Sequence, residues 1–332
     1  MLTGPGTSAS ARPSTAEPPS TAATRDSWAG DGAVTPATLQ LPRAREYVRV
    51  HPRAQDRRLE ALMACFLAPP GAVPAPRTLL VAAHPDDETI GAGAMLPRLA
   101  DGLTLLHVTD GAPRHRRQWG RQEYRTWEEY ASQRRRELEA ALRVAGIDPA
   151  VASRLGVMDN EATLNLVALT HQLMEVIDRA RPQVLLTHPY EGGHTDHDAT
   201  AFAARAACRL LARDGETPPA LAEFTSYHNL GGERVLNRFL PFEGVPVTDV
   251  PLSAEEKDVK RRMCDCYITQ IAAIRDVPIR YERFRAAPRY DFTQAPHPGR
   301  LRCERYPFGM NGAEWRAHAA AALRELGLDR EK

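Results

Sequence analysis

The stretch Leu79-Leu80-Val81-Ala82-Ala83-His84-Pro85-Asp86-Asp87-Glu88 decides the fold class of this 332-residue chain. Residues 79–83 are a short apolar run that ends at a turn containing proline, which is typical of a buried strand in a parallel sheet. The charged pentapeptide 84–88 follows the carboxyl end of that strand. Because ligands of open α/β sheets bind at this end of the strands, the pentapeptide is a candidate functional loop.

Strand and helix patterns alternate after this loop. We expect strands over 77–83, 103–109 and 183–187, and helices over 127–144 and 165–180. Such alternation predicts an α/β fold with a Rossmann-like, mostly parallel sheet and helices on both faces. Right-handed crossovers would bring the carboxyl ends of strands 77–83 and 183–187 to the same edge of the sheet.

Changes in composition predict four segments along the chain. They are a disordered Ser/Thr/Ala/Pro-rich tail (1–42), an N-terminal helix with a Pro-rich linker (43–76), the α/β domain (77–275), and an irregular C-terminal cap with a final helix (276–332) that belongs to the same domain. The tail has few large apolar residues, so it cannot bury enough surface to offset the entropy of ordering. We expect helices over 43–68, 253–275 and 313–326, and no regular structure over 276–311.

Composition excludes several classes of protein. The formal net charge of +1 gives no general attraction to nucleic acid or anionic membranes. No apolar stretch approaches the ~20 residues that span a bilayer, and no basic region precedes an apolar one at the N-terminus. The five cysteines are odd in number and scattered, which favours a reducing cytoplasm over a disulfide framework.

A second polar cluster, His188-Pro189-Tyr190-Glu191-Gly192-Gly193-His194-Thr195-Asp196-His197-Asp198, follows the strand predicted over 183–187. Thr195 and Asp198 have the spacing of a capping-box variant for a helix that begins near Asp196. His194 would then lie just before the helix and His197 in its first turn. Both imidazoles would point toward the sheet edge where the first motif emerges.

These two clusters together suit a catalytic metal site. A catalytic zinc typically takes three protein ligands and keeps one position for water, and two histidines with one carboxylate meet that need. The first motif would supply His84 and one aspartate, and the second motif another histidine. Adjacent aspartates in a turn project differently, so one can bind the metal while the other accepts a proton from water. The pattern therefore suggests metal-assisted hydrolysis.

The paired motifs Ala83-His84-Pro85-Asp86-Asp87-Glu88 and His194-Thr195-Asp196-His197 resemble the PIG-L/LmbE-like zinc-dependent de-N-acetylase family. The resemblance covers roughly residues 77–270. It extends to Val108-Thr109-Asp110-Gly111, to Arg134-Arg135-Arg136-Glu137-Leu138 and to Asp159. That family includes enzymes that deacetylate N-acetylglucosaminyl-inositol compounds and other N-acetylated sugars.

The resemblance implies a ligand set and a base. It implies one Zn²⁺ per chain, held by His84, Asp87 and His197. Asp86 would be the general base that takes a proton from the attacking water. His194 would be the cationic or hydrogen-bonding partner of the developing oxyanion.

The resemblance also implies roles for residues around the metal. Asp196 would orient one of the two histidines from outside the ligand set. Arg134 and Asp159 match positions that contact sugar hydroxyls in relatives. Some relatives carry a tyrosine two residues before the first histidine of the second motif, whereas this chain has Gly192 there, and the nearby Tyr190 is out of register.

The expected function is a cytoplasmic zinc hydrolase that removes the acetyl group from an N-acetylated amino sugar or sugar conjugate. Its partner would be a small molecule, with no nucleic acid and no membrane span. Two alternatives belong to other classes. A metal-dependent phosphoesterase would use two metals and more carboxylate ligands. A non-catalytic sugar- or nucleotide-binding module would lack the free carboxylate that Asp86 provides. The role of Glu88 is open.

Overall fold

The computed structural model describes residues 56–120, 123–306 and 309–329. All described residues belong to a single compact unit. The predicted disordered tail and residues 43–55 of the predicted first helix lie outside the described residues.

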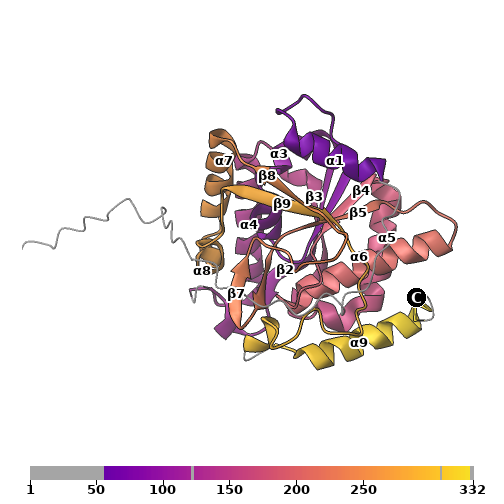
Figure 1. The fold of residues 1–332 in the computed structure, drawn as a ribbon. Coiled ribbons are helices and arrows are strands. Elements are labelled where there is room, and N and C mark those ends of the chain that lie inside the picture. Colours follow the sequence, from indigo (N-terminus) through magenta and orange to yellow (C-terminus); the bar gives the residue numbers. More distant parts are fainter. Residues whose placement is uncertain (1–55, 121–122, 307–308, 330–332) are drawn as a thin grey trace, which may run out of the picture. The chain divides into compact units, whose positions relative to one another are not determined.

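The described residues form a seven-stranded sheet with the order β3-β2-β1-β4-β5-β9-β8 (Figure 1). The strands are β1 (Thr78–Ala82), β2 (Leu103–Pro113), β3 (Ala152–Asp159), β4 (Val184–Thr187), β5 (Ala220–Phe224), β8 (Val247–Pro251) and β9 (Tyr281–Ala286). Strands β3, β2, β1, β4 and β5 pair in parallel, and β9 is antiparallel to both of its neighbours. A separate hairpin joins β6 (Tyr227–Leu230) to β7 (Glu233–Leu236). The predicted mostly parallel sheet is confirmed.

Helices cover both faces of this sheet, as the alternating pattern predicts. On β1, Leu80 and Ala82 face one apolar core, and Leu79 and Val81 face the other. The first core is covered by α1 (Arg57–Leu67), α2 (Asp87–Ala92), α3 (Leu96–Leu99), α4 (Trp127–Val144), α7 (Ala254–Asp265) and α8 (Ile271–Ile274). The second core is covered by α5 (Leu166–Ala180), α6 (Thr195–Arg213) and α9 (Gly312–Glu325), which lie together in Figure 1. Each residue of a strand therefore faces one fixed side of the sheet. This in turn determines where the loop that follows the strand leaves the sheet.

Two of the strands that were not among the expected ones show why the sequence pattern missed them. The edge strand β3 was not predicted, because it leaves most of its side chains partly or fully exposed and contains a glycine. Strand β9 lies inside the segment that was expected to be irregular. Its charged residues Glu282 and Arg285 are buried, where Lys260 and Glu223 pair with them. Because ion-paired residues occupy buried positions of this strand, it lacks the alternation of apolar residues by which a strand is predicted.

The C-terminal half of the sheet also supports the first helix after β1. Lys260 Nζ, on α7, donates to the carbonyl of Ile90 at 2.8 Å and to Glu282 Oε1 at 2.6 Å. The same Glu282 oxygen accepts the backbone N–H of Ala94 at 2.9 Å. Helix α2 is thus fixed by residues nearly two hundred positions later in the chain.

The described ranges contain no helix that has both the length and the apolar character needed to cross a membrane.

Candidate metal-dependent active site

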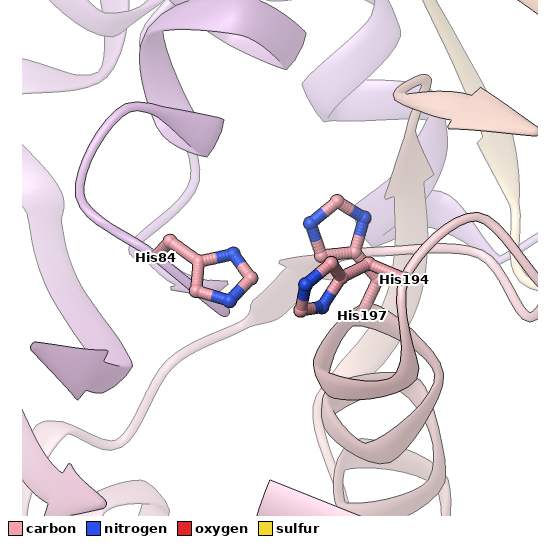
Figure 2. Close-up of side chains that lie close together, drawn as sticks. All are labelled: His84, His194 and His197. Atoms are coloured by element: carbon pink, nitrogen blue, oxygen red, sulfur yellow. The ribbon is translucent and has the colours of Figure 1, made fainter. Parts of the chain in front are cut away.

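The two polar clusters meet because their strands are neighbours. Strand β1 pairs in parallel with β4, with Leu79 opposite Leu185, so the loops that follow the two strands leave the same edge of the sheet. His84 comes from the first loop, and His194 and His197 from the start of α6 (Figure 2). The ring centroid of His84 lies 4.6 Å from that of His194 and 5.3 Å from that of His197. The predicted juxtaposition of the two motifs is therefore present.

The loop after β1 separates its two aspartates. Asp86 has a φ of 133°, a backbone conformation that is unfavourable for residues other than glycine. Asp87 begins α2, and its Oδ2 accepts the backbone N–H of His84 at 2.8 Å. The side chain of Asp87 lies among the histidines, and that of Asp86 lies beside Arg134. Adjacent aspartates in this turn thus face different partners, as the sequence indicates.

The residues expected to bind a metal lie around Asp87. Asp87 bridges the two histidines, with its Oδ2 3.1 Å from His84 Nδ1 and its Oδ1 3.2 Å from His197 Nε2. The outer nitrogen of each ring has another partner. His84 Nε2 lies 3.2 Å from Asp196 Oδ2 and 3.4 Å from Asp159 Oδ1. His197 Nδ1 lies 3.3 Å from Ser226 Oγ. Such outer contacts fix the tautomer and orientation of metal-ligating histidines, and two imidazoles with a carboxylate are donors of the type that zinc takes.

Within the described ranges, the sets containing His197 whose ligand atoms all lie within 4.8 Å of one another join His84 and His197 to His194, or Asp87 and His197 to His188. The ligand set of His84, Asp87 and His197 therefore stays a prediction.

His188 is a buried site residue to which the sequence analysis assigned no role. Together with Asp87 and His197 it forms one of three clusters whose ligand atoms are close enough for one metal. However, His188 Nε2 accepts the backbone N–H of Ala83 at 3.0 Å, which occupies the lone pair that faces Asp87. The ring also stacks on His197 at a centroid distance of 4.1 Å. His188 is therefore better placed to support the ring of His197 than to bind a metal ion. Its position in a His-Pro turn directly after a buried strand is the signal that could have found it.

His194 caps α6, which corrects the expected start of this helix. The helix begins at Thr195, and the N-cap is His194, whose Nδ1 accepts the backbone N–H of Asp196 at 3.2 Å. Because Nδ1 is an acceptor, the neutral ring carries its proton on Nε2 and can donate from there. Burial and the neighbouring His84 lower the pKa of His194 to about 4. The neutral hydrogen-bonding form is therefore favoured over the cationic one.

The side chain of Asp196 contacts the first motif rather than a histidine of its own motif. Its Oδ2 faces His84 Nε2 and also accepts the backbone N–H of Asn160 at 2.7 Å, and its Oδ1 accepts that of Ala162 at 3.2 Å. The expectation that Asp196 orients one of the two histidines stays a prediction, and the imidazole that its side chain contacts is His84. Asp196 thus links α6, the loop after β3 and the metal-ligand candidate His84.

Arg134 lies beside Asp86, and the pKa values of the two adjacent aspartates differ. Its Nη2 donates to the carbonyl of Pro85 and lies 3.5 Å from Asp86 Oδ2. Gly111 allows this approach, because a Cβ there would lie 2.8 Å from the guanidinium. Burial raises the pKa of Asp86 to about 8, although Arg134 opposes the increase. Burial acts in the same direction on Asp87, but His197 and His188 hold its pKa well below the usual value. Divergent pKa values in a carboxylate pair are typical of divided catalytic roles.

The two residues expected to contact a sugar differ in exposure. Arg134 is only 2 % exposed, although within the described ranges its Nε and Nη1 have no hydrogen-bond partner. The side chain of Asp159 is 14 % exposed and contacts His84 Nε2 through one oxygen. Their contact with substrate stays a prediction.

Buried imidazoles and carboxylates thus converge at the carboxyl edge of a mostly parallel sheet, with one carboxylate outside the ligand set. This combination is typical of metal-dependent α/β hydrolases. Residues 79–208 match the family model described as PIG-L: GlcNAc-PI de-N-acetylase. The matched region begins in the strand before the first motif and includes the second motif.

Solved structures with a similar fold were also found. The A40926 pseudoaglycone deacetylase Dbv21 is 22 % identical, with 65 % of this chain and 98 % of that chain covered and a TM-score of 0.48. The N,N'-diacetylchitobiose deacetylase from Pyrococcus horikoshii is 18 % identical, with 72 % and 94 % covered and a TM-score of 0.42. GalB, the 4-carboxy-2-hydroxymuconate hydratase from Pseudomonas putida KT2440, is 17 % identical, with 65 % and 98 % covered and a TM-score of 0.43. No curated protein matches the sequence.

Proposed function

We propose that this protein is a metal-dependent N-deacetylase that hydrolyses the acetamide of an N-acetylated amino sugar or sugar conjugate to a free amine and acetate. The observation that carries the proposal is the divided aspartate pair. Asp87 lies between His84 and His197, while Asp86 stays outside the ligand set beside Arg134. The description of the matched family, a GlcNAc-PI de-N-acetylase, supports an acetamide as the bond cleaved.

The metal that we propose is one Zn²⁺ per chain, held by His84, Asp87 and His197. Two imidazoles and a carboxylate are a common ligand set for catalytic zinc, which keeps further positions for exchangeable ligands. When bound, the ion would act as a Lewis acid for both water and the amide carbonyl.

The protein side chains would carry the proton transfers. Asp86 would take a proton from the attacking water, and Arg134 would hold this carboxylate in place. His194 would donate a hydrogen bond from Nε2 to the oxyanion that develops from the carbonyl, a contribution typically worth about 3–4 kcal/mol. The leaving nitrogen must be protonated before it departs, and Asp86, which has accepted the proton of the attacking water, can supply that proton. Arg134 and Asp159 remain the proposed contacts to sugar hydroxyls.

The compartment that we propose is the cytoplasm. The five cysteines, all within the described ranges, are free thiols. Free thiols are typical of a reducing compartment, where disulfides do not persist.

The phosphoesterase alternative makes a different prediction about metal content. A second cluster of possible ligands, His84 with Asp159 and Asp196, shares His84 with the proposed zinc site. In that cluster both carboxylates approach His84 at the same nitrogen, Nε2. Asp196 also already accepts hydrogen bonds from two backbone N–H groups. We therefore propose one metal, and a stoichiometry near two per chain would favour the alternative.

The experiment that tests the function is acetate release from a panel of N-acetylhexosamine conjugates. The purified protein would be assayed with Zn²⁺, after chelation, and after zinc is restored, and phosphate release from sugar phosphates would be measured in parallel. We expect zinc-dependent acetate release from at least one conjugate and no phosphate release. A protein that binds no divalent metal, or that releases only phosphate, would overturn the proposal.

A further inference from the structure

Glu88 is the most completely satisfied carboxylate of the first motif. Its side chain has no exposed surface and accepts hydrogen bonds at both oxygens. Oε1 accepts from the hydroxyl of Tyr267 at 2.5 Å and from that of Thr89 at 2.7 Å. Oε2 accepts the backbone N–H of Asp86 at 3.0 Å and lies 3.0 Å from His107 Nε2. Because its acceptor positions are filled by protein groups, Glu88 cannot itself contact substrate.

The Asp86 N–H is the contact that links Glu88 to the chemistry. Asp86 holds a φ of 133°, and residues in such sparsely populated backbone regions cost on the order of 1–3 kcal/mol. They persist only where the surroundings impose the conformation. Apart from the turn's own helix contact, in which Ile90 N donates to Asp86 O, the partner that reaches the Asp86 backbone is Glu88 Oε2.

We propose that Glu88 is a positioning residue that holds Asp86 in its strained conformation, and that Tyr267 and His107 fix Glu88 in turn. Tyr267 follows α7 and His107 lies on β2, so the carboxylate joins three parts of the fold behind the proposed base. This inference rests on the proposed function, because it assigns Glu88 a role in aiming the general base. Displacing a reacting group by about 1 Å costs roughly 10²-fold in rate.

Substitution of Glu88 gives the first test. Glu88→Ala removes the acceptor for Asp86 N–H, so we expect kcat to fall about 10²-fold while KM and zinc content change little. In Glu88→Gln, the amide oxygen can still accept from Asp86 and the amide NH₂ can face the two hydroxyls, which can rotate to accept. Rescue of kcat to within about 10-fold of wild type by Glu88→Gln is the expected result.

A matched pair of tyrosine variants keeps the test independent of folding defects. The hydroxyl of Tyr290 also donates to a buried glutamate, Glu223 Oε2, at 3.0 Å, but in the cluster around Arg285. Tyr267→Phe and Tyr290→Phe should both lower the unfolding midpoint. Only Tyr267→Phe should lower kcat, by about 3- to 10-fold, with KM unchanged.

Hydrogen exchange gives a readout that does not depend on activity. The amide of Asp86 should exchange faster in Glu88→Ala and Tyr267→Phe than in wild type and Tyr290→Phe, with and without zinc. If the wild type deacetylates but these variants keep its kcat and its exchange at Asp86, the positioning role is wrong. If the wild type neither binds zinc nor releases acetate, the proposed function is wrong. Faster exchange of the Asp86 amide in the variants would even then show that Glu88 holds this turn.

Discussion

Two of the clusters of buried charge in the described part of the chain differ in how their charges are compensated. One is the site cluster, made of His84, Asp86, Asp87, Arg134, Asp159, Asp196 and His197. The other is the Arg285 cluster, made of Glu191, Glu223, His228, Arg285 and Tyr290. In the second, the guanidinium donates to Glu223 Oε2 at 2.8 Å, to the carbonyl of Leu240 at 2.7 Å and to Tyr290 Oη at 2.9 Å. The nearby Glu191 accepts the backbone N–H of Leu240 and lies 3.1 Å from His228 Nδ1. The guanidinium of this cluster is therefore matched by protein acceptors, whereas Glu191 Oε2 and His228 Nδ1 have no hydrogen-bond partner within the described ranges.

The site cluster is not matched in this way. It contains the carboxylates of Asp86, Asp87, Asp159 and Asp196, and Arg134 is the permanent cation that faces them. The buried imidazole of His84 is surrounded by these carboxylates, which raise its pKa well above the usual value although burial acts in the opposite direction. Burying surplus negative charge is costly unless a cation accompanies it. The two clusters therefore indicate that an excess of buried carboxylates, rather than burial of charge itself, marks the candidate functional site.

Removing a proposed metal ligand should have the largest effect on the site cluster. In His84→Ala we expect zinc content to fall close to zero and acetate release to fall by more than about 10³-fold, because the proposed ion loses one of its three protein ligands. Metal analysis after exhaustive dialysis, with turnover on the best substrate, measures both. Stoichiometric zinc in His84→Ala would contradict the ligand assignment.

Neutralising the proposed base should separate binding from chemistry. Asp86→Asn keeps the size of the side chain but cannot accept the proton, so we expect normal zinc content and a 10²- to 10⁴-fold loss of kcat. Thermal unfolding serves as the control, since the fold should be retained. Turnover close to that of wild type would show that another group is the base.

Breaking the matched cluster should affect stability instead of metal binding. Arg285→Met leaves the buried carboxylate of Glu223 without its partner, and loss of one member of a buried pair typically costs about 3–5 kcal/mol of unfolding free energy. Urea denaturation measures this loss, and the folded fraction should still bind zinc. A change below about 1 kcal/mol, or loss of zinc from folded protein, would contradict the assignment of a purely structural role.

The smallest expected effect is a pH dependence of the matched cluster. Burial raises the pKa of Glu223 from 4.5 to about 7, against the opposing effect of Arg285. The folded state then keeps a proton that the unfolded state has lost, so the contribution of Glu223 to stability decreases as the pH rises from about 4.5 to 7. Glu223→Gln should remove this slope, which amounts to at most ~3 kcal/mol. Urea denaturation of both proteins at pH 5 and pH 8 measures it, and parallel curves would contradict the shift.

Much of the fold could be predicted because local patterns agreed with it. The helix predicted over 127–144 is α4, and the strand predicted over 183–187 is β4 from Val184 to Thr187. Strand β9 escaped prediction because its buried residues include Glu282 and Arg285, whose partners Lys260 and Glu223 are far away in sequence. A pattern of apolar residues carries no information about such distant ion pairs.

The two motifs that meet at the candidate site could be predicted, but the residues that support them could not. His84, Asp87 and His197 lie in two short motifs that follow buried strands, and parallel strand ends necessarily meet. Tyr267 could not be foreseen, because it reaches Glu88 across 179 positions and nothing near it in sequence indicates that contact. Side-chain contacts between distant elements depend on tertiary packing, which local sequence does not encode.

The attachment of α2 to Lys260 and Glu282 also sets an order of assembly during synthesis. The first motif leaves the ribosome early, yet the carbonyl of Ile90 and the N–H of Ala94 obtain these partners only once residue 282 has been made. Contacts of such long sequence separation form late, because the loop that joins them must first close. The nascent chain therefore carries an unfinished catalytic loop until most of its length has been translated. Truncation before β9 would leave the motif intact in sequence but unsupported in structure.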